Sequence, residues 1–155
     1  MPGPTPVPGT RHALELTVQR AVRAAALPAR STLRRWASAA LERDARVTLR
    51  FVGSREGRAL NAAYRGRDYA TNVLTFVYDV VAPLAGDVVV CLPVVRREAR
   101  EQRKSFRAHL AHLVVHGMLH LQGYDHERDA DAAAMEARET AILRGLRYAD
   151  PYAVR

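Results

Sequence analysis

Cysteine, lysine and long apolar runs are scarce in this sequence, and two of these scarcities exclude a class of protein. Cys91 is the one cysteine, so no disulfide can form within the chain, and a small disulfide-stabilised secreted domain is excluded. No apolar run is long enough to cross a bilayer, and no segment repeats at a fixed period. These absences favour an ordinary globular protein of a reducing compartment.

The positive charge of the chain is carried almost entirely by arginine. Lys104 is the one lysine among 24 basic residues, which face 16 acidic residues and give a net charge of +8. An excess of this size favours a polyanionic partner, of which RNA and DNA are the commonest. The coding bias of an arginine- and alanine-rich proteome would explain the choice of arginine over lysine, but it would not explain the excess of basic over acidic residues. We therefore expect contact with nucleic acid.

Length and composition indicate one folded domain. The chain has 155 residues, of which 48% are hydrophobic and 26% charged, which is enough to fill a single core. Residues 1–10 contain four prolines and two glycines, so we expect a flexible tail there and a single domain over 11–155. This start lacks the apolar stretch and the cleavage site of a signal peptide, and a cytoplasmic protein is therefore expected.

Four segments have the pattern of β-strands. Apolar and polar residues alternate over 14–18, although the spacing of Leu14, Val18 and Val22 also suits a helix. A second strand is predicted around 47–51. The β-rich runs 72–78 and 87–92, joined by a short loop, predict a hairpin or two adjacent strands.

Five helices are predicted between and after these strands. The one that begins after Ser105 is largely apolar and is expected to be buried, with Gly123 ending it. The mixture of strands and helices predicts a single-domain α+β fold, in which helices cover a small mixed sheet of about four strands. The predicted helices start at Ser31 or Thr32, at about 58, at Pro93, at 106 and at about 128.

Three histidines between His116 and His126 give the strongest functional signal. His116 and His120 are four residues apart on the predicted helix, which places their Cβ atoms about 5–6 Å apart on one face, where both can bind one metal ion. Gly123 allows a sharp turn, after which His126 can supply a third nitrogen. Three protein ligands leave a fourth position for water, as in catalytic zinc sites. We therefore expect one Zn²⁺ per chain at the end of a buried helix.

Histidines on an apolar helix are often ordinary core residues with hydrogen-bond partners. This is our interpretation of His109 and His112, which add no ligand that the site lacks. For the group of three, a chance grouping in the core is the weaker alternative, because the spacing suits one ion and a glycine stands where the turn is needed.

The same frame, His-x3-His-x5-His with a glycine three residues after the second histidine, occurs in metzincin proteases. Those proteases carry glutamate directly after the first histidine, where it acts as the general base. Here that position is Gly117. A metalloprotease that works by this mechanism would lack its base, and it remains the less favoured alternative.

Four segments carry motifs of one known family. His116–His126 matches the signature H-G-x-L-H-L-x-G-Y-D-H at every specified position, and 60–74 matches L-N-x-x-Y-R-G-x-D-x-x-T-N-V-L. Gly86-Asp87 is similar to the start of a family strand, and Tyr148–Tyr152 is similar to the family's tail. On these motifs the sequence resembles the YbeY endoribonucleases, which are bacterial rRNA maturation factors. The resemblance is clear over 47–152 and loose over the first forty residues.

The resemblance implies roles for individual residues and a function. His116, His120 and His126 match the family's metal ligands, and Arg65 matches an arginine that the family needs for activity. The implied protein is a zinc-dependent endoribonuclease that prefers single strands and acts in late 16S rRNA 3′-end maturation and in ribosome quality control. RNA and the small ribosomal subunit are the implied partners, with a small-subunit ribosomal protein and an assembly GTPase beside them and no membrane. A non-catalytic assembly factor with a structural zinc is the alternative.

Further polar residues have two interpretations each. Arg65 lies in a turn-rich segment, 65–70, and is either the catalytic arginine that the resemblance implies or an ordinary surface residue. Asp87 is either an acceptor for the N–H of a ligand histidine or a turn residue before its strand. Neither the general base nor the RNA-binding residues are identified. Four arginines form either a basic stripe for phosphates or a solvated face, namely Arg96, Arg100, Arg103 and Arg107.

Overall fold

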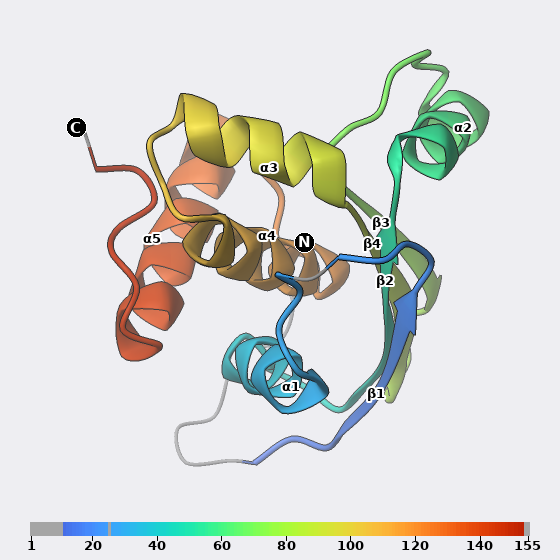
Figure 1. Cartoon of the computed structure of the whole chain (residues 1–155). Coiled ribbons are helices and arrows are strands. Elements are labelled where there is room, and N and C mark those ends of the chain that lie inside the picture. The colour runs from blue at the N-terminus through green and yellow to red at the C-terminus, as the bar shows by residue number, and fades with distance from the viewer. Residues whose placement is uncertain (1–10, 25, 154–155) are drawn as a thin grey trace.

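Four strands pair into one mixed sheet in the computed structural model, which describes residues 11–24 and 26–153. β1 (Leu14–Arg20) pairs in parallel with β2 (Ala45–Val52), and β2 pairs in parallel with β4 (Leu84–Cys91). β3 (Val73–Asp79) is an edge strand and pairs antiparallel with β4 (Figure 1). The predicted strands and the hairpin are confirmed. The start that we expected to be a flexible tail, 1–10, lies outside the described residues.

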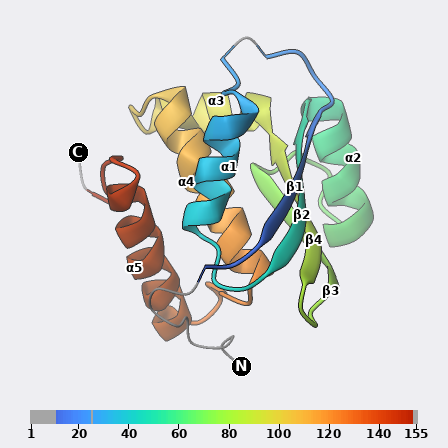
Figure 2. The same ribbon diagram turned by 90° about the horizontal axis from the view of Figure 1, so that it is seen from below.

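The described helices lie on both faces of the sheet. α1, α3, α4 and α5 cover one face, and α2 alone covers the other (Figure 2). The fold is therefore α+β with a small helix-covered sheet, as the sequence predicts. In the described part of the chain, no helix is both long enough and apolar enough to cross a membrane. The helices span Arg30–Ala39 (α1), Ser54–Arg65 (α2), Leu92–Glu101 (α3), Phe106–Leu121 (α4) and Asp129–Gly145 (α5).

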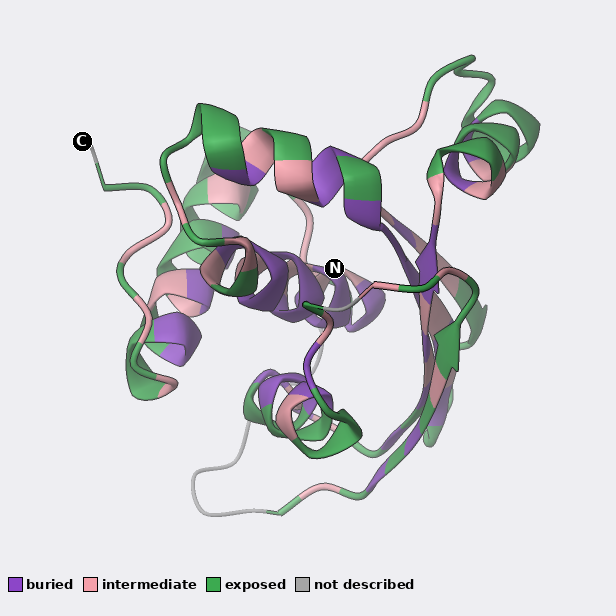
Figure 3. Cartoon of the chain, viewed as in Figure 1, coloured by how far each residue is buried: buried purple, intermediate pink, exposed green. Residues whose placement is uncertain are grey.

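α4 is the central helix of the larger layer. It packs against β3, β4, α1, α3 and α5, and most of its residues are buried (Figure 3). Its start is fixed by the predicted cap, since the backbone N–H of Ala108 donates to Ser105 Oγ at 3.0 Å. α4 thus carries its C-terminal half, with two of the expected metal ligands, to a fixed position beside the sheet.

The start of α1 differs from the prediction. The helix begins at Arg30, and the residue before it, Ala29, makes no side-chain cap. Ser31 and Thr32 lie inside the first turn, so neither is the cap. The Arg30 side chain donates to the carbonyl oxygen of Leu16 in β1 at 2.6 Å, so contact with the sheet helps hold this end of the helix in place.

Two of the four arginines in the expected basic stripe lie over aromatic rings. The guanidinium carbon of Arg96 is 5.3 Å from the ring centre of Phe106, and that of Arg107 is 5.6 Å from the ring centre of Trp36. Because α3 ends at Glu101 and α4 begins at Phe106, the four arginines do not share one continuous helix. The four arginines are therefore divided among α3, the loop after it and α4.

Gly117 allows α4 to lie close to the sheet. A Cβ atom at this position would lie 2.6 Å from Val88 Cγ1 and 3.4 Å from Val73 Cγ2. The first distance is well inside van der Waals contact, and Val88 is fully buried in β4. A side chain at position 117 would therefore push the helix, and the histidines on either side of this glycine, away from the strands.

Gly117→Ala is expected to lower the free energy of unfolding by about 1–2 kcal/mol. Overpacking a core typically costs about 1–3 kcal/mol, and the better helix propensity of alanine returns up to about 1 kcal/mol. Urea denaturation of the metal-free protein measures the change. Gly145→Ala is the control, because nothing lies within 4 Å of a Cβ atom there, and it should be neutral or mildly stabilising. Equal stabilisation by both substitutions would contradict the close packing.

Candidate metal centre

Three histidine rings lie close together at the C-terminal end of α4. The rings of His116 and His120 are nearly parallel, with an interplanar angle of 6° and centres 6.5 Å apart. The ring of His126, from the loop after the helix, is 5.6 Å from that of His116 and 6.1 Å from that of His120. His126 is exposed, and the other two are partly buried. The structure thus brings together the three residues that the sequence nominates as ligands, beside solvent.

The turn after α4 is built to return His126 to the helix end. Gly123 has a φ of +107°, a conformation that suits glycine, and the N–H of Tyr124 donates to the carbonyl of Leu119 at 3.1 Å. Asp125 Oδ1 then accepts from the backbone N–H of His126 at 2.7 Å. The glycine and the aspartate of the motif therefore fix the backbone that carries the third histidine.

The tyrosine of the motif ties this turn to the rest of the protein. The Tyr124 hydroxyl lies 3.0 Å from both carboxylate oxygens of Glu42, a buried residue that also accepts from Arg138 Nε at 2.8 Å. Burial raises the pKa of Tyr124, and the hydrogen bond to Glu42 raises it further, so the hydroxyl stays protonated and remains a donor. The turn is thereby attached to α5 through Arg138 and to the segment after α1 through Glu42.

Hydrogen bonds occupy one nitrogen of each helical histidine and leave the other available. His116 Nδ1 lies 2.7 Å from Glu139 Oε1, and His120 Nδ1 lies 3.0 Å from the carbonyl oxygen of Tyr124. A carboxylate and a carbonyl only accept, so both Nδ1 atoms carry a proton, and in the neutral ring each Nε2 then keeps a lone pair. Burial lowers the pKa of His120 and outweighs the hydrogen bond to the Tyr124 carbonyl, which raises that pKa. The lowered pKa favours the neutral ring. This is the form in which imidazole binds a metal ion, and the residues present therefore fit one.

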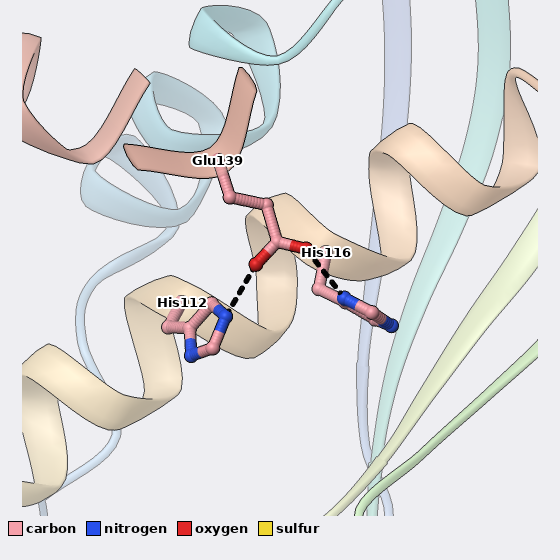
Figure 4. A group of neighbouring side chains, drawn as sticks. All are labelled: His112, His116 and Glu139. Atoms are coloured by element: carbon pink, nitrogen blue, oxygen red, sulfur yellow. Dashed lines mark hydrogen bonds and ion pairs between the residues drawn. The ribbon is translucent and has the colours of Figure 1, made fainter. Parts of the chain in front are cut away.

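Glu139 is part of the centre and was missed by the sequence analysis. It comes from α5, its side chain is fully buried, and it lies between His112 and His116 (Figure 4). It accepts hydrogen bonds from His112 Nε2, from His116 Nδ1 and from the Tyr152 hydroxyl, the last at 2.7 Å. A signal was present, because Glu139 lies four residues after the buried Met135 and three before the buried Ile142. An acid on the apolar face of a helix needs buried partners.

The charge states around Glu139 follow from its surroundings. Burial alone would raise the pKa of Glu139, but hydrogen bonds from His112 and His116 outweigh burial and hold that pKa well below its usual range. Burial lowers the pKa of His112 and favours the neutral ring. His112 Nδ1 is buried and has no hydrogen-bond partner among the described residues, which is consistent with a proton on Nε2 alone. The site therefore contains one buried carboxylate anion that accepts from His112, His116 and Tyr152.

Two groups of side chains in the described part of the chain could hold a metal ion. One is His112, His116 and Glu139, and the other is His120, Asp125 and His126, each with donor atoms within 4.8 Å of one another. In the first group His112 Nε2, His116 Nδ1 and both Glu139 oxygens are already joined by hydrogen bonds, so an ion there would have to replace them. The second group contains two of the three motif histidines, and the ring of the third, His116, is 5.6 Å from that of His126 and 6.5 Å from that of His120.

Arg65 lies on the other face of the sheet from α4. It is the last residue of α2 and is exposed, rather than part of a turn as predicted, and Gly66, with a φ of +67°, ends the helix. The neighbouring Tyr64 ring is 4.8 Å from that of Phe76 in β3, which places this end of α2 beside the edge strand. Val73 of the same strand lies near Gly117 of α4, so β3 has the end of α2 beside one face and α4 beside the other.

Asp87 does not bind a ligand histidine. Its carboxylate accepts from the Tyr78 hydroxyl at 2.6 Å, on the strand next to it. Gly86 and Val88 face α4, as their contacts with Leu121 and with position 117 show. Side chains alternate along a strand, so Asp87 points to the opposite face. Both interpretations are wrong, because Asp87 points away from the histidines and lies within β4 (Leu84–Cys91) rather than in a turn before it.

A helix that ends in clustered histidines, packed on a small mixed sheet, defines a class of α+β protein whose side chains could hold a metal ion at the end of that helix. The family model described as endoribonuclease YbeY matches residues 17–147. The chain belongs to the YbeY family, and the resemblance read from the motifs is confirmed.

Relatives and a solved structure agree with this placement. A protein of Azoarcus sp. is 60% identical over 159 residues, which cover 96% of this chain but 63% of that protein. A protein of Aromatoleum aromaticum is 60% identical over 143 residues, covering 90% of this chain and 93% of its own length. Both are named endoribonuclease YbeY. The solution structure of a Thermotoga maritima protein matches 89% of this chain and all of its own, with a TM-score of 0.56 and 26% identity.

Proposed function

We propose that this protein is a zinc-dependent endoribonuclease that binds one Zn²⁺ per chain through His116, His120 and His126. The observation that carries the proposal is the pairing of His116 with Glu139 and of His120 with the Tyr124 carbonyl, which leaves two Nε2 lone pairs beside His126. Membership of a family whose relatives are named endoribonucleases supplies the substrate class. The assay that tests it is cleavage of a defined single-stranded RNA by metal-loaded protein.

The residues of the chain have separate tasks in this scheme. When bound, zinc polarises a phosphoryl oxygen or lowers the pKa of water from about 15.7 toward about 7. Glu139 and the Tyr124 carbonyl hold the two helical imidazoles in one tautomer and one orientation. Arg65, at the end of α2 beside the edge strand, would contact phosphate oxygens of an RNA strand that passes around this edge to the metal, where its guanidinium would offset the negative charge that builds up during cleavage.

Exposed aromatic rings near Arg65 support a preference for single strands. Tyr64 and Tyr78 expose 67% and 69% of their surface, and both lie on or beside β3. An aromatic ring on the surface can stack on an unpaired base, whereas the bases of a duplex are already stacked on one another. The net charge of +8 provides attraction for the phosphates.

The biological role that we propose is late maturation of the 16S rRNA 3′ end and ribosome quality control in the cytoplasm. The small ribosomal subunit, one of its proteins and an assembly GTPase are the proposed partners. This role rests on the motifs shared with the family. Cleavage of a precursor 16S rRNA with an extended 3′ end, compared with an unrelated single-stranded RNA of equal length, tests it.

Two other functions have testable differences. A metalloprotease of the metzincin kind needs a glutamate at position 117, where a Cβ atom would already lie 2.6 Å from Val88. Pure metal-loaded protein should therefore cleave RNA and leave casein intact. An assembly factor with a structural zinc would bind RNA without cleaving it. Removal of its zinc would then lower the stability of the protein, and no RNA cleavage would be seen with or without the metal.

RNA binding is expected to weaken steeply as salt rises. Each phosphate neutralised on a single strand contributes a slope of about 0.7 in the logarithmic plot, so three contacts give a loss of roughly 20-fold between 50 and 200 mM salt. Fluorescence anisotropy with labelled U12 and A12 oligonucleotides measures this, and the two should differ little. Affinity that stays constant across the titration would contradict binding through phosphates.

A further inference from the structure

The carboxylate of Glu139 links the metal centre to the C-terminal segment of the chain. Tyr152, which follows α5, donates its hydroxyl to Glu139 Oε2 at 2.7 Å, while the residue remains 43% exposed. The segment is held from outside by Lys104, whose Nζ donates to the Pro151 carbonyl at 3.0 Å, and within the segment Asp150 Oδ1 accepts from the Tyr152 N–H at 2.8 Å. A tyrosine outside the histidine motif therefore reaches the carboxylate that contacts His116.

The hydrogen bonds of Glu139 leave it unsuited to bind the metal itself. Oε1 accepts from His116, and Oε2 accepts from both His112 and Tyr152. A direct bond to an ion would require at least one of these contacts to break in a fully buried position. An anion that accepts from the Nδ1–H of an imidazole instead fixes that ring and makes its Nε2 a stronger donor to a metal.

We propose that Glu139 is a positioning residue, which holds His116 for the metal, and that Tyr152 and His112 hold Glu139 in turn. This proposal rests on the metal site of the proposed function. Its consequence is that the C-terminal segment contributes to metal affinity although none of its residues is a ligand. The loss of metal affinity should be smaller for residues further from the ion, so replacing Glu139 should weaken binding more than replacing Tyr152.

Zinc affinity provides the test, by competition with a chelating indicator on the full chain. Glu139→Gln should bind zinc about 10–100-fold more weakly, because its amide group brings a donor to atoms that need an acceptor. Glu139→Asp should recover part of the loss, since the charge is kept on a shorter side chain. Tyr152→Phe should weaken binding severalfold. Glu136→Gln, an exposed glutamate of the same helix, controls for the loss of one negative charge and should leave affinity unchanged.

Cobalt substitution separates a positioning role from direct ligation. If Glu139 only positions His116, the visible spectrum of the Co²⁺ protein should keep its band positions in Glu139→Gln, with more Co²⁺ needed for saturation. Shifted bands in Glu139→Gln would show that the ligand set has changed and would overturn the proposal. Zinc affinity within twofold of wild type in a folded Glu139→Gln protein would also overturn it. If Glu139→Gln does not fold, Tyr152→Phe decides, because its ring packing is kept, and unchanged affinity there would overturn the proposal.

The outcome is independent of whether the protein cleaves RNA. Weakened zinc binding in Glu139→Gln supports the positioning role even if wild-type protein proves inactive on RNA, in which case the proposed function alone fails. Conversely, RNA cleavage by a wild-type protein whose zinc affinity does not depend on Glu139 would sustain the function and refute the positioning role.

Discussion

Arg65→Ala is expected to lower single-turnover cleavage of RNA by about 10²–10³-fold, the usual effect of losing one electrostatic stabiliser of a transition state. Zinc content and thermal midpoint should remain near wild type, because the side chain is exposed at the end of α2 and contributes little core packing. Equilibrium binding of the same RNA should weaken far less than cleavage. Arg65→Lys should restore little, since an ammonium group lacks the planar fork that spans two phosphoryl oxygens.

Arg67→Ala is the matched control for this experiment. Arg67 is also exposed and lies two residues further along the chain, so its replacement removes the same charge from the same region. It should reduce binding modestly and leave the cleavage rate of bound RNA unchanged. If Arg65→Ala lowers binding and cleavage by one common factor, Arg65 is only an RNA contact. If it changes neither, Arg65 is an ordinary surface residue and the role implied by the family motif is wrong here.

His120→Ala should reduce the zinc content from about one ion per chain to nearly none. Two of the three histidines would remain. The Tyr124 carbonyl would lose the hydrogen bond that it accepts from the His120 ring. Much of the fold should survive, because His120 lies at the partly exposed end of α4. Metal analysis after gentle purification and after reloading gives the stoichiometry, and His12→Ala, outside the cluster, should keep a full complement of zinc.

Metal analysis also distinguishes the three motif histidines from the alternative ligand group, His112, His116 and Glu139. An ion held by His112, His116 and Glu139 would survive His120→Ala and would be lost in His112→Ala. An ion held by the three motif histidines would be lost in His120→Ala and only weakened in His112→Ala. A wild-type protein that neither retains nor takes up zinc would contradict both possibilities.

Local patterns in the sequence were sufficient for most of the fold. The strands and helices follow from the spacing of apolar residues, and the N-cap at Ser105 follows from local chemistry. The strand order was not predictable in this way, because β2 pairs with β1 and β4 across connections that leave no local signal. The start of α1 was misplaced because Arg30 is held by a carbonyl of β1, a contact distant in the sequence.

The candidate site was predictable only where its residues are close in sequence. His116, His120 and His126 lie within one motif, whose turn chemistry could be read directly. Glu139 contacts His116 across 23 residues, and periodicity alone does not give the relative placement of α4 and α5. Asp87 had two interpretations until its contact with Tyr78 was known, since a strand pattern does not say which alternate face meets α4.

A zinc titration of metal-free wild-type protein, followed by cleavage of a defined single-stranded RNA, tests the central claim most directly. Cleavage should be absent without metal, rise in proportion to added zinc and stop rising at about one equivalent per chain. The His120→Ala protein, titrated over the same range, should remain inactive while it still binds the RNA. Undiminished cleavage by the metal-free wild-type protein, or equal cleavage by His120→Ala, would contradict a catalytic zinc held by the three histidines.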